Sequence, residues 1–346
     1  MAASNQSDGM WNEGQNQSVV DVLMMYLHLF CWWCQFPVCA LGIFGNGWVL
    51  FAFSKYPKLR KIECLHLIAG LAVFDLFTTF GGYIYYGGQF LVAYNFVSHY
   101  SRGTCLWYGM INFIGLQGSP LMTTLIAYDR YLAFRDPTNY FFKPHTTYAA
   151  RSFLATLLFT LSSVSTCMVL LVVSGFYHLP PVVCNITGGA LREYMAAFSI
   201  YMNCTGISNI FLFVRTLMLM RKVTPAPGHT KVAQRLERQI RITRAISAVL
   251  TFYVFSLVVP NLIFGALNVF KAPDIWRGRI GPWVSLGGSL NSAVNVFIYS
   301  HKHKEMRKFL LAAIRCKSEE SIADAHKNAT LSRGNRLHGK QQQQAQ

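Results

Sequence analysis

Seven long apolar stretches, separated by shorter polar segments, set the pattern of hydrophobic and polar positions along the chain. A helix needs roughly 20 apolar residues to cross a bilayer core about 30 Å thick. Several stretches contain a proline, among them Pro37, Pro120 and Pro260, which membrane helices tolerate because neighbouring helices satisfy the freed backbone groups. The pattern predicts an all-α membrane protein, a seven-transmembrane helix bundle. The predicted spans are Val22–Phe53, Leu65–Tyr86, Cys105–Phe134, Tyr148–Val173, Tyr194–Met220, Ala245–Phe270 and Ile280–Tyr299.

Composition and charge favour a membrane protein over other classes. The chain is 53% hydrophobic and 13% charged, whereas a soluble domain carries about 25% charged residues. A net charge of +17 would favour nucleic-acid binding only if the basic residues shared one accessible face. They lie instead between the apolar stretches and in the tail, so we expect contact with membrane lipid and no nucleic-acid partner.

The basic residues also predict the orientation, because loops rich in Lys and Arg stay in the cytoplasm. We expect a plasma-membrane protein with an extracellular N-terminal segment (1–21), a seven-helix domain (22–300) and a cytoplasmic C-terminus. Residues 301–316 are basic and amphipathic, which predicts a short eighth helix on the membrane surface. The polar tail, 317–346, is predicted to be disordered. The basic residues left outside are Arg102, Arg192, Lys271, Arg277 and Arg279.

The outer segments carry signals for modification. Residues 1–21 contain no basic residue, so we expect no cleavable signal peptide and insertion through the first helix. Three Asn-x-Ser/Thr tripeptides lie on the predicted outer side and are candidate glycosylation sites. They begin at Asn5, Asn16 and Asn185.

The nine cysteines fall into different environments. Cys105 and Cys184 both face the oxidising side, which favours a disulfide between them. Such a bond would close a loop of about 80 residues and contribute roughly 4 kcal/mol in the chain-entropy model. Cys316 ends the amphipathic basic segment, where palmitoylation is a candidate modification.

Asp75 lies in the centre of the second span, where a carboxylate costs about 2.5–3.5 kcal/mol on insertion scales. It therefore needs polar partners, and two interpretations stay open. A protonated Asp75 could join a hydrogen-bonded packing cluster, or hard oxygen ligands could hold a small cation, with Na⁺ as an allosteric ion. The candidate partners at matching depth are Ser119, Asn291, Ser292 and Asn295.

A stripe of mostly polar residues runs along the third span. Steps of three and four residues put them on one helical face, which we expect to point into the bundle. At its inner end stands Asp129-Arg130-Tyr131, interpreted as an ion pair that can be released. Helix 7 carries a second line at four-residue intervals, Asn291, Asn295 and Tyr299. The first line consists of Asn112, Leu116, Ser119, Thr123, Ala127 and Arg130.

These features, in this order, resemble rhodopsin-like (class A) G-protein-coupled receptors over residues 22 to 316. Within that superfamily, the stretches 101–107, 126–130 and 290–308 are similar to the nematode serpentine chemoreceptor class SX. The ordered motifs are Gly45-Asn46, Leu71-Ala72-x-x-Asp75, Cys105 before Asp129-Arg130-Tyr131, Pro137, Pro260 and Asn295-Val-Phe-Ile-Tyr299.

The resemblance implies a receptor that transmits an extracellular ligand, a small molecule or a peptide, to a cytoplasmic heterotrimeric G protein. Helix 6 would swing outward about Pro260, Arg130 would leave Asp129, and Tyr299 would turn inward to hold the cleft open. Because the bundle would be biased from both sides, ligand and G protein would raise each other's affinity.

Several positions depart from the family pattern. Val258 stands where the family usually has an aromatic switch, Val296 replaces the usual helix 7 proline, and Ile240 replaces an acid that locks Arg130. Activation is therefore expected to depend less on an aromatic switch and on an ionic lock of Arg130.

The ligand pocket is expected within two turns of the outer ends and should be neutral and partly aromatic. Asn112 stands where amine receptors carry an Asp, which disfavours a biogenic amine, and helix 7 has no Lys for a retinal Schiff base. The candidate lining residues are Tyr108, Asn112, Phe113, Asn261, Phe264 and Ser285.

Other functions remain as alternatives to a chemosensory receptor. A neuropeptide receptor would share most of these motifs. A transporter or channel would show charges along several helices and internal symmetry, and a membrane enzyme would need a metal or nucleophile cluster. The chain shows neither pattern, so we expect no enzyme activity and no cofactor beyond the candidate Na⁺.

Overall fold

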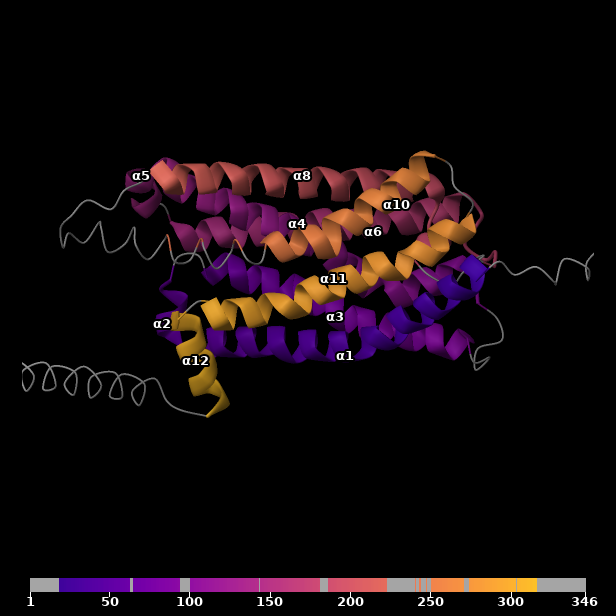
Figure 1. The fold of residues 1–346 in the computed structure, drawn as a ribbon, viewed down its shortest axis with the longest axis horizontal. Coiled ribbons are helices and arrows are strands. Elements are labelled where there is room, and N and C mark those ends of the chain that lie inside the picture. Colours follow the sequence, from indigo (N-terminus) through magenta and orange to yellow (C-terminus); the bar gives the residue numbers. More distant parts are fainter. Residues whose placement is uncertain are drawn as a thin grey trace, which may run out of the picture.

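The computed structural model describes residues 19–62, 65–93, 100–142, 144–180, 186–222, 240, 243, 247, 250–270, 274–302 and 304–315. Within these ranges the regular structure is helical, and the long helices lie side by side as a bundle (Figure 1). The long elements are α1 (Val19–Lys55), α3 (Leu65–Ala93), α4 (Arg102–Arg135), α6 (His145–Val173), α8 (Arg192–Lys222), η1 with α10 (Val254–Val258 and Val259–Val269) and α11 (Asp274–Lys302).

Four short helices mark the two ends of the bundle. α2 (Pro57–Arg60), α5 (Pro137–Phe142) and α12 (Lys304–Ile314) lie at one end, called here the α5 end, and α12 crosses it at a steep angle to the bundle (Figure 1). α7 (Ile186–Gly189) lies at the opposite end, called the α7 end, against α4 and α11. The predicted fold class, seven long helices with a short eighth, is confirmed.

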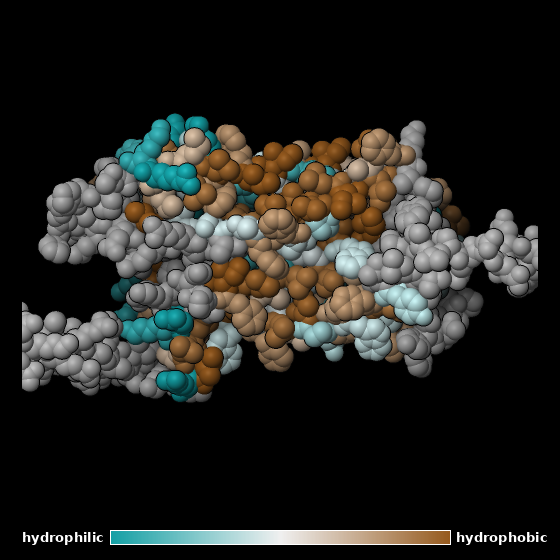
Figure 2. Space-filling view, viewed as in Figure 1, coloured by the Kyte–Doolittle hydropathy of each residue, from teal (hydrophilic) through white to brown (hydrophobic). Residues whose placement is uncertain are grey.

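The bundle carries apolar residues outside, as lipid requires. Six described helices, all but α11 among the long ones, are long and apolar enough to span a membrane. Large apolar side chains such as Phe44, Phe255 and Val173 are exposed, and brown patches cover the middle of the visible face in Figure 2. The more polar α11 instead buries its Ser and Asn residues, including Ser289, Ser292 and Asn295, inside the bundle.

Glycines bring α3 and α4 into close backbone contact. A Cβ atom on Gly81 would lie 2.1 Å from the Asn112 nitrogen, and one on Gly115 would lie 2.2 Å from the Thr78 nitrogen. Small residues permit this approach, which membrane helices use because lipid offers no hydrophobic drive for association. The close contact sets Asp75 of α3 beside Ser119 of α4.

The observed helices extend beyond several predicted spans, and the sixth contains a feature that the sequence did not indicate. Residues 254–258 form a π-helical turn in which the Val259 N–H donates to the Val254 carbonyl. Pro260 follows closely, and its missing N–H removes a bond of the regular i to i−4 ladder. Single π turns of this kind occur often at functional sites.

Candidate functional site

Asp75 is the centre of a polar cluster that joins three helices. Its Oδ1 accepts hydrogen bonds from the hydroxyls of Ser119 (2.6 Å) and Ser292 (2.9 Å), and its Oδ2 accepts one from the Asn295 amide (2.9 Å). All four side chains are buried. Removing one partner would leave a buried charged or polar group unsatisfied, so the cluster ties α3, α4 and α11 together.

The donor set around Asp75 fits a small hard cation. One carboxylate and two hydroxyls supply oxygen ligands of the kind that such cations prefer. The side-chain oxygens of Asn291 and Asn295 are also buried without a hydrogen-bond partner among the described residues. Buried acceptors normally have a donor or an ion, so these residues are suited to hold Na⁺. Asn291 itself has no described hydrogen bond to Asp75.

A second polar tie joins α1 to α11 next to this cluster. The Asn46 amide donates to the carbonyls of Gly42 (3.0 Å) and Ser292 (3.1 Å). Ser292 thus connects Asn46 to Asp75, because its hydroxyl reaches the carboxylate while its carbonyl accepts from α1. Gly45 makes this possible, since a Cβ there would lie 3.1 Å from a Val296 methyl.

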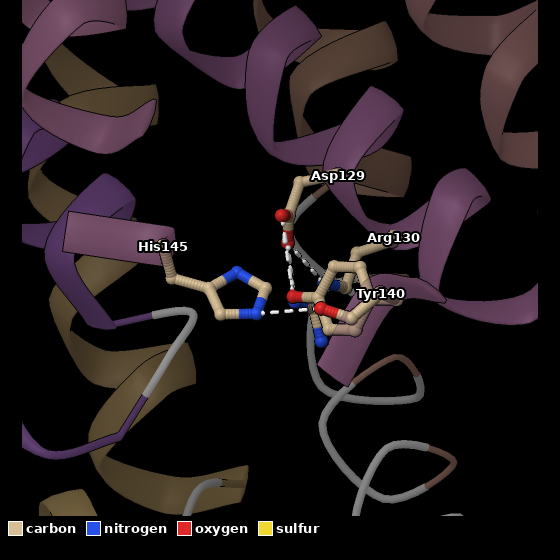
Figure 3. Close-up of polar contacts among 4 residues, drawn as sticks. All are labelled: Asp129, Arg130, Tyr140 and His145. Carbon is tan, nitrogen blue, oxygen red and sulfur yellow. Dashed lines mark hydrogen bonds and ion pairs between the residues drawn. The ribbon is translucent and has the colours of Figure 1, made fainter. Parts of the chain in front are cut away.

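The α5 end contains a buried ion pair with a third partner (Figure 3). The Arg130 Nε donates to Asp129 Oδ2 (3.0 Å), and its Nη2 makes a second, shorter contact with the same oxygen. Nη2 also donates to the Tyr140 hydroxyl (2.6 Å), which in turn lies 3.1 Å from Asp129 Oδ2. Arg130 is 1% exposed. A buried ion pair persists only when its hydrogen bonds are completed, and Tyr140 of α5 helps to complete these.

His145 supports Tyr140 from the start of α6. Its Nε2 lies 2.9 Å from the Tyr140 backbone carbonyl, and the two rings pack with centroids 4.5 Å apart. Figure 3 shows the four residues from α4, α5 and α6 meeting at one point. The arrangement fixes α5 against Arg130.

A narrow cavity of about 40 Å³ lies between α3, α4, α8, η1, α10 and α11 towards the α7 end. A water occupies one probe sphere of roughly 10–15 Å³, so the cavity admits a few waters or a very small ligand. Two lining residues carry hydroxyls: that of Tyr85 accepts from the Ile186 N–H (3.0 Å), and that of Ser285 is buried without a hydrogen-bond partner among the described residues. The lining residues are Tyr85, Phe113, Leu116, Ile186, Met195, Phe198, Met202, Leu257, Phe264, Gly281, Val284 and Ser285.

The comparison with protein families gives the identity. The family described as 7 transmembrane receptor (rhodopsin family) matches residues 45–299. The chain belongs to this receptor family. The comparison with curated proteins found no match.

The matched region of the receptor contains both polar clusters and the cavity. The family therefore accounts for a multi-pass membrane protein with receptor architecture, and it favours a receptor over the transporter, channel or enzyme alternatives.

Some residues predicted for the ligand pocket of the receptor lie elsewhere. Phe113, Phe264 and Ser285 line the cavity. Asn112 instead donates to the Thr78 carbonyl (2.7 Å), and Asn261 donates to the Leu257 carbonyl (2.8 Å), so both amides are used within and between helices. Tyr108 packs over Gly88, where a Cβ would lie 2.7 Å from its ring. Proximity to the outer ends of the helices, on which the prediction rested, does not determine where these side chains point.

Tyr140 was missed by reasoning from the sequence. It lies ten residues after Arg130 in the short helix α5, outside the predicted spans, where no periodicity links it to a face of α4. Pro137 was a usable signal, because proline favours the first turn of a helix and α5 begins there. Tyr131, which was predicted to take part, stacks instead on Tyr128 with centroids 6.5 Å apart.

Several predictions for the receptor lie outside the described residues and stay predictions. Cys105 is buried at the start of α4, but its predicted disulfide partner is not described. The predicted glycosylation and palmitoylation sites are not described either, nor is the side chain of Tyr299, which was predicted to act in activation. These residues are Cys184, Asn5, Asn16, Asn185, Cys316 and the side chain of Tyr299.

Proposed function

We propose that this receptor is chemosensory and transmits the binding of a small neutral molecule to a heterotrimeric G protein. The α7 end faces the exterior and the α5 end the cytoplasm of a plasma-membrane receptor. The observation that carries the proposal is the burial of Arg130 within a completed set of partners. A charge at this depth is costly and usually functional. Its partner Tyr140 comes from α5, so a shift of α5 against α4 would remove that contact and loosen the hold on Arg130.

The lining of the cavity supports a small neutral ligand. None of the lining residues carries a charge, and most are aromatic or aliphatic. A charged ligand would be buried there without a counter-ion, and the free-energy cost of burying an unpaired charge is far larger than that of burying an apolar group. The Ser285 hydroxyl offers one hydrogen bond and so favours a ligand with a single polar group. The similarity of several stretches to the nematode chemoreceptor class SX points in the same direction.

The region between the cavity and the Arg130 cluster supports a two-state switch. Leu257 lines the cavity and belongs to the π turn that precedes Pro260. A ligand that pushes on Leu257 would act at the point where the helix has lost its regular hydrogen bonding. Outward movement of the segment before Pro260 would open a G-protein cleft, and ligand and G protein would then favour the same state.

The Asp75 cluster supports an allosteric role for Na⁺ in this switch. Na⁺ held by Asp75, Ser119, Ser292 and the free oxygens of Asn291 and Asn295 would favour the closed arrangement of α3, α4 and α11. Activation would then release the ion, so ligand and Na⁺ would oppose each other.

A ligand screen on whole cells tests the proposed function. Cells expressing the full chain, with a cAMP or Ca²⁺ reporter, would be exposed to neutral volatile compounds and, separately, to a library of neuropeptides. We expect responses to neutral compounds, weakened at least tenfold in potency by Phe264→Ala in the cavity. Ile263→Ala, on the exposed side of the same helix, is the matched control. Responses to peptides alone would reject the small-molecule ligand and favour a neuropeptide receptor.

A further inference from the structure

A second cavity lies on the outer surface of the bundle, between α8 and the turns that lead into η1. Its volume is about 150 Å³, considerably larger than that of the cavity towards the α7 end. It is separate from that cavity, since the two share no lining residue. The lining residues are Asn209, Ile210, Phe213, Leu250, Thr251, Tyr253, Val254 and Phe255.

The cavity opens towards lipid. Phe255, at its edge, is 71% exposed, and Ile210 and Thr251 are also exposed, whereas Leu250 and Tyr253 form the buried floor. Most of its lining is apolar, and its polar side chains are Asn209, Thr251 and Tyr253. A molecule dissolved in the bilayer could therefore enter without crossing the protein.

Two buried polar atoms without a partner among the described residues lie at the floor of the cavity. The Tyr253 hydroxyl and the Asn209 side-chain oxygen are buried, and neither has a hydrogen-bond partner among the described residues. Tyr253 lies beside Asn209 and Thr205, but no hydrogen bond with suitable geometry joins them. The Asn209 amide is directed to the Pro120 carbonyl, at 3.5 Å. One hydroxyl placed between Tyr253 and Asn209 could accept from the first and donate to the second.

The depth of the site selects the chemistry of its occupant. Asn209 lies near the middle of the 31-residue helix α8, so the floor is close to the centre of the bilayer. Phospholipid headgroups stay at the interface, and a charged group would be strongly disfavoured at this depth. A cavity of about 150 Å³ lined by apolar residues holds a molecule of roughly the size of benzene. We propose that this cavity binds a small, neutral, lipid-dissolved phenol or alcohol, with its hydroxyl between Tyr253 and Asn209.

Such an occupant would act on η1. Val254 and Phe255 line the cavity and also form the first two residues of the π turn. A molecule wedged between them and Phe213 of α8 would resist a change in the spacing of the two helices. The inference concerns binding to the lipid-facing surface, so it does not depend on the proposed ligand cavity or on G-protein coupling.

The binding test compares two small molecules of nearly the same shape. Purified full-chain receptor in detergent micelles would be titrated with p-cresol and with p-xylene, which lacks the hydroxyl, and thermal unfolding would be followed. We expect both to raise the unfolding temperature and p-cresol to bind about fivefold more tightly, because one buried hydrogen bond contributes roughly 1 kcal/mol. Tyr253→Phe should remove this preference while p-xylene still binds.

A substitution that fills the cavity provides the second part of the test. Ile210→Trp should abolish the response to both compounds, whereas Ile207→Trp, on the exposed surface of the same helix, should leave it unchanged. Equal affinities for p-cresol and p-xylene in the unmodified receptor would overturn the hydroxyl site and assign the two polar atoms to water. An undiminished response in Ile210→Trp would show that the compounds act through the micelle or at another site, and would overturn the proposal.

Discussion

Gly287 of α11 lies directly against the backbone carbonyl of Ser256 in η1, and a Cβ atom on Gly287 would be 1.8 Å from that oxygen. Ser256 is four residues before Pro260, so its carbonyl is the acceptor that Pro260 cannot serve. The carbonyl therefore faces the neighbouring helix, and only a glycine leaves room for it. This contact joins η1 to α11.

Gly287→Ala should separate the two helices at this point. Overpacking of a tight interface costs about 1–3 kcal/mol, and we expect a lower unfolding temperature of the purified receptor together with higher basal signalling. Gly47→Ala is the matched control, because a Cβ there meets no atom within 4 Å and alanine favours a helix. An unfolding temperature as high in Gly287→Ala as in Gly47→Ala would contradict the close contact.

Tyr140→Phe should raise ligand-independent signalling. The substitution removes the hydroxyl that contacts both Asp129 and Arg130, and hydrogen bonds to charged groups contribute about 1.5–3 kcal/mol each. Loss of even half of that from the resting state shifts the equilibrium about tenfold towards release of Arg130. A reporter assay without ligand, normalised to surface expression, measures the effect. Tyr128→Phe removes a hydroxyl from an exposed neighbour, and equal basal activity in the two variants would reject the role of Tyr140.

Na⁺ should stabilise the receptor through Asp75. In thermal unfolding at constant ionic strength, replacing K⁺ by Na⁺ should raise the unfolding temperature of the unmodified chain. Asp75→Asn keeps the size of the side chain and removes its charge, so the difference between the two salts should disappear. A Na⁺ effect that persists in Asp75→Asn would leave the cluster as a hydrogen-bonded tie without an ion.

The predicted disulfide can be tested by peptide mapping. Digestion of the full chain under non-reducing conditions should yield one peptide pair containing Cys105 and Cys184, which separates on reduction. The bond is expected because both cysteines lie on the predicted outer side, in an oxidising compartment. Recovery of both cysteines as free thiols would contradict the prediction and the orientation from which it derives.

The sequence predicted the elements of the fold because membrane spans are determined by length and hydropathy. Asp75 and its partners were also predictable, since a carboxylate in an apolar helix requires polar neighbours and only a few lie at its depth. The π turn was not predicted, because Pro260 indicates a missing hydrogen bond but not whether the helix before it widens into a π turn. Tyr140 was missed because it lies in α5, a short helix outside the predicted spans, and no pattern in the sequence indicates the phase of α5 relative to α4.

The predicted pocket residues also show that the sequence did not indicate the direction of individual side chains. Asn112 and Asn261 were predicted to line the pocket because they lie near the outer ends of their helices, but each amide is directed to a backbone carbonyl. Side-chain direction and depth depend on close helix contacts such as that between Gly81 and Asn112. These contacts come from residues far apart in the chain.

The role of Arg130 as the coupling residue is tested most directly by nucleotide exchange. Purified receptor would be mixed with each member of a panel of heterotrimeric G proteins, and GTP uptake would be followed with the unmodified chain and with Arg130→Ala. The account predicts that the unmodified receptor accelerates exchange on at least one heterotrimer and that Arg130→Ala, although folded, loses this acceleration. Equal exchange rates with and without Arg130, or no acceleration by the unmodified receptor on any heterotrimer when it is activated by a ligand, would contradict it.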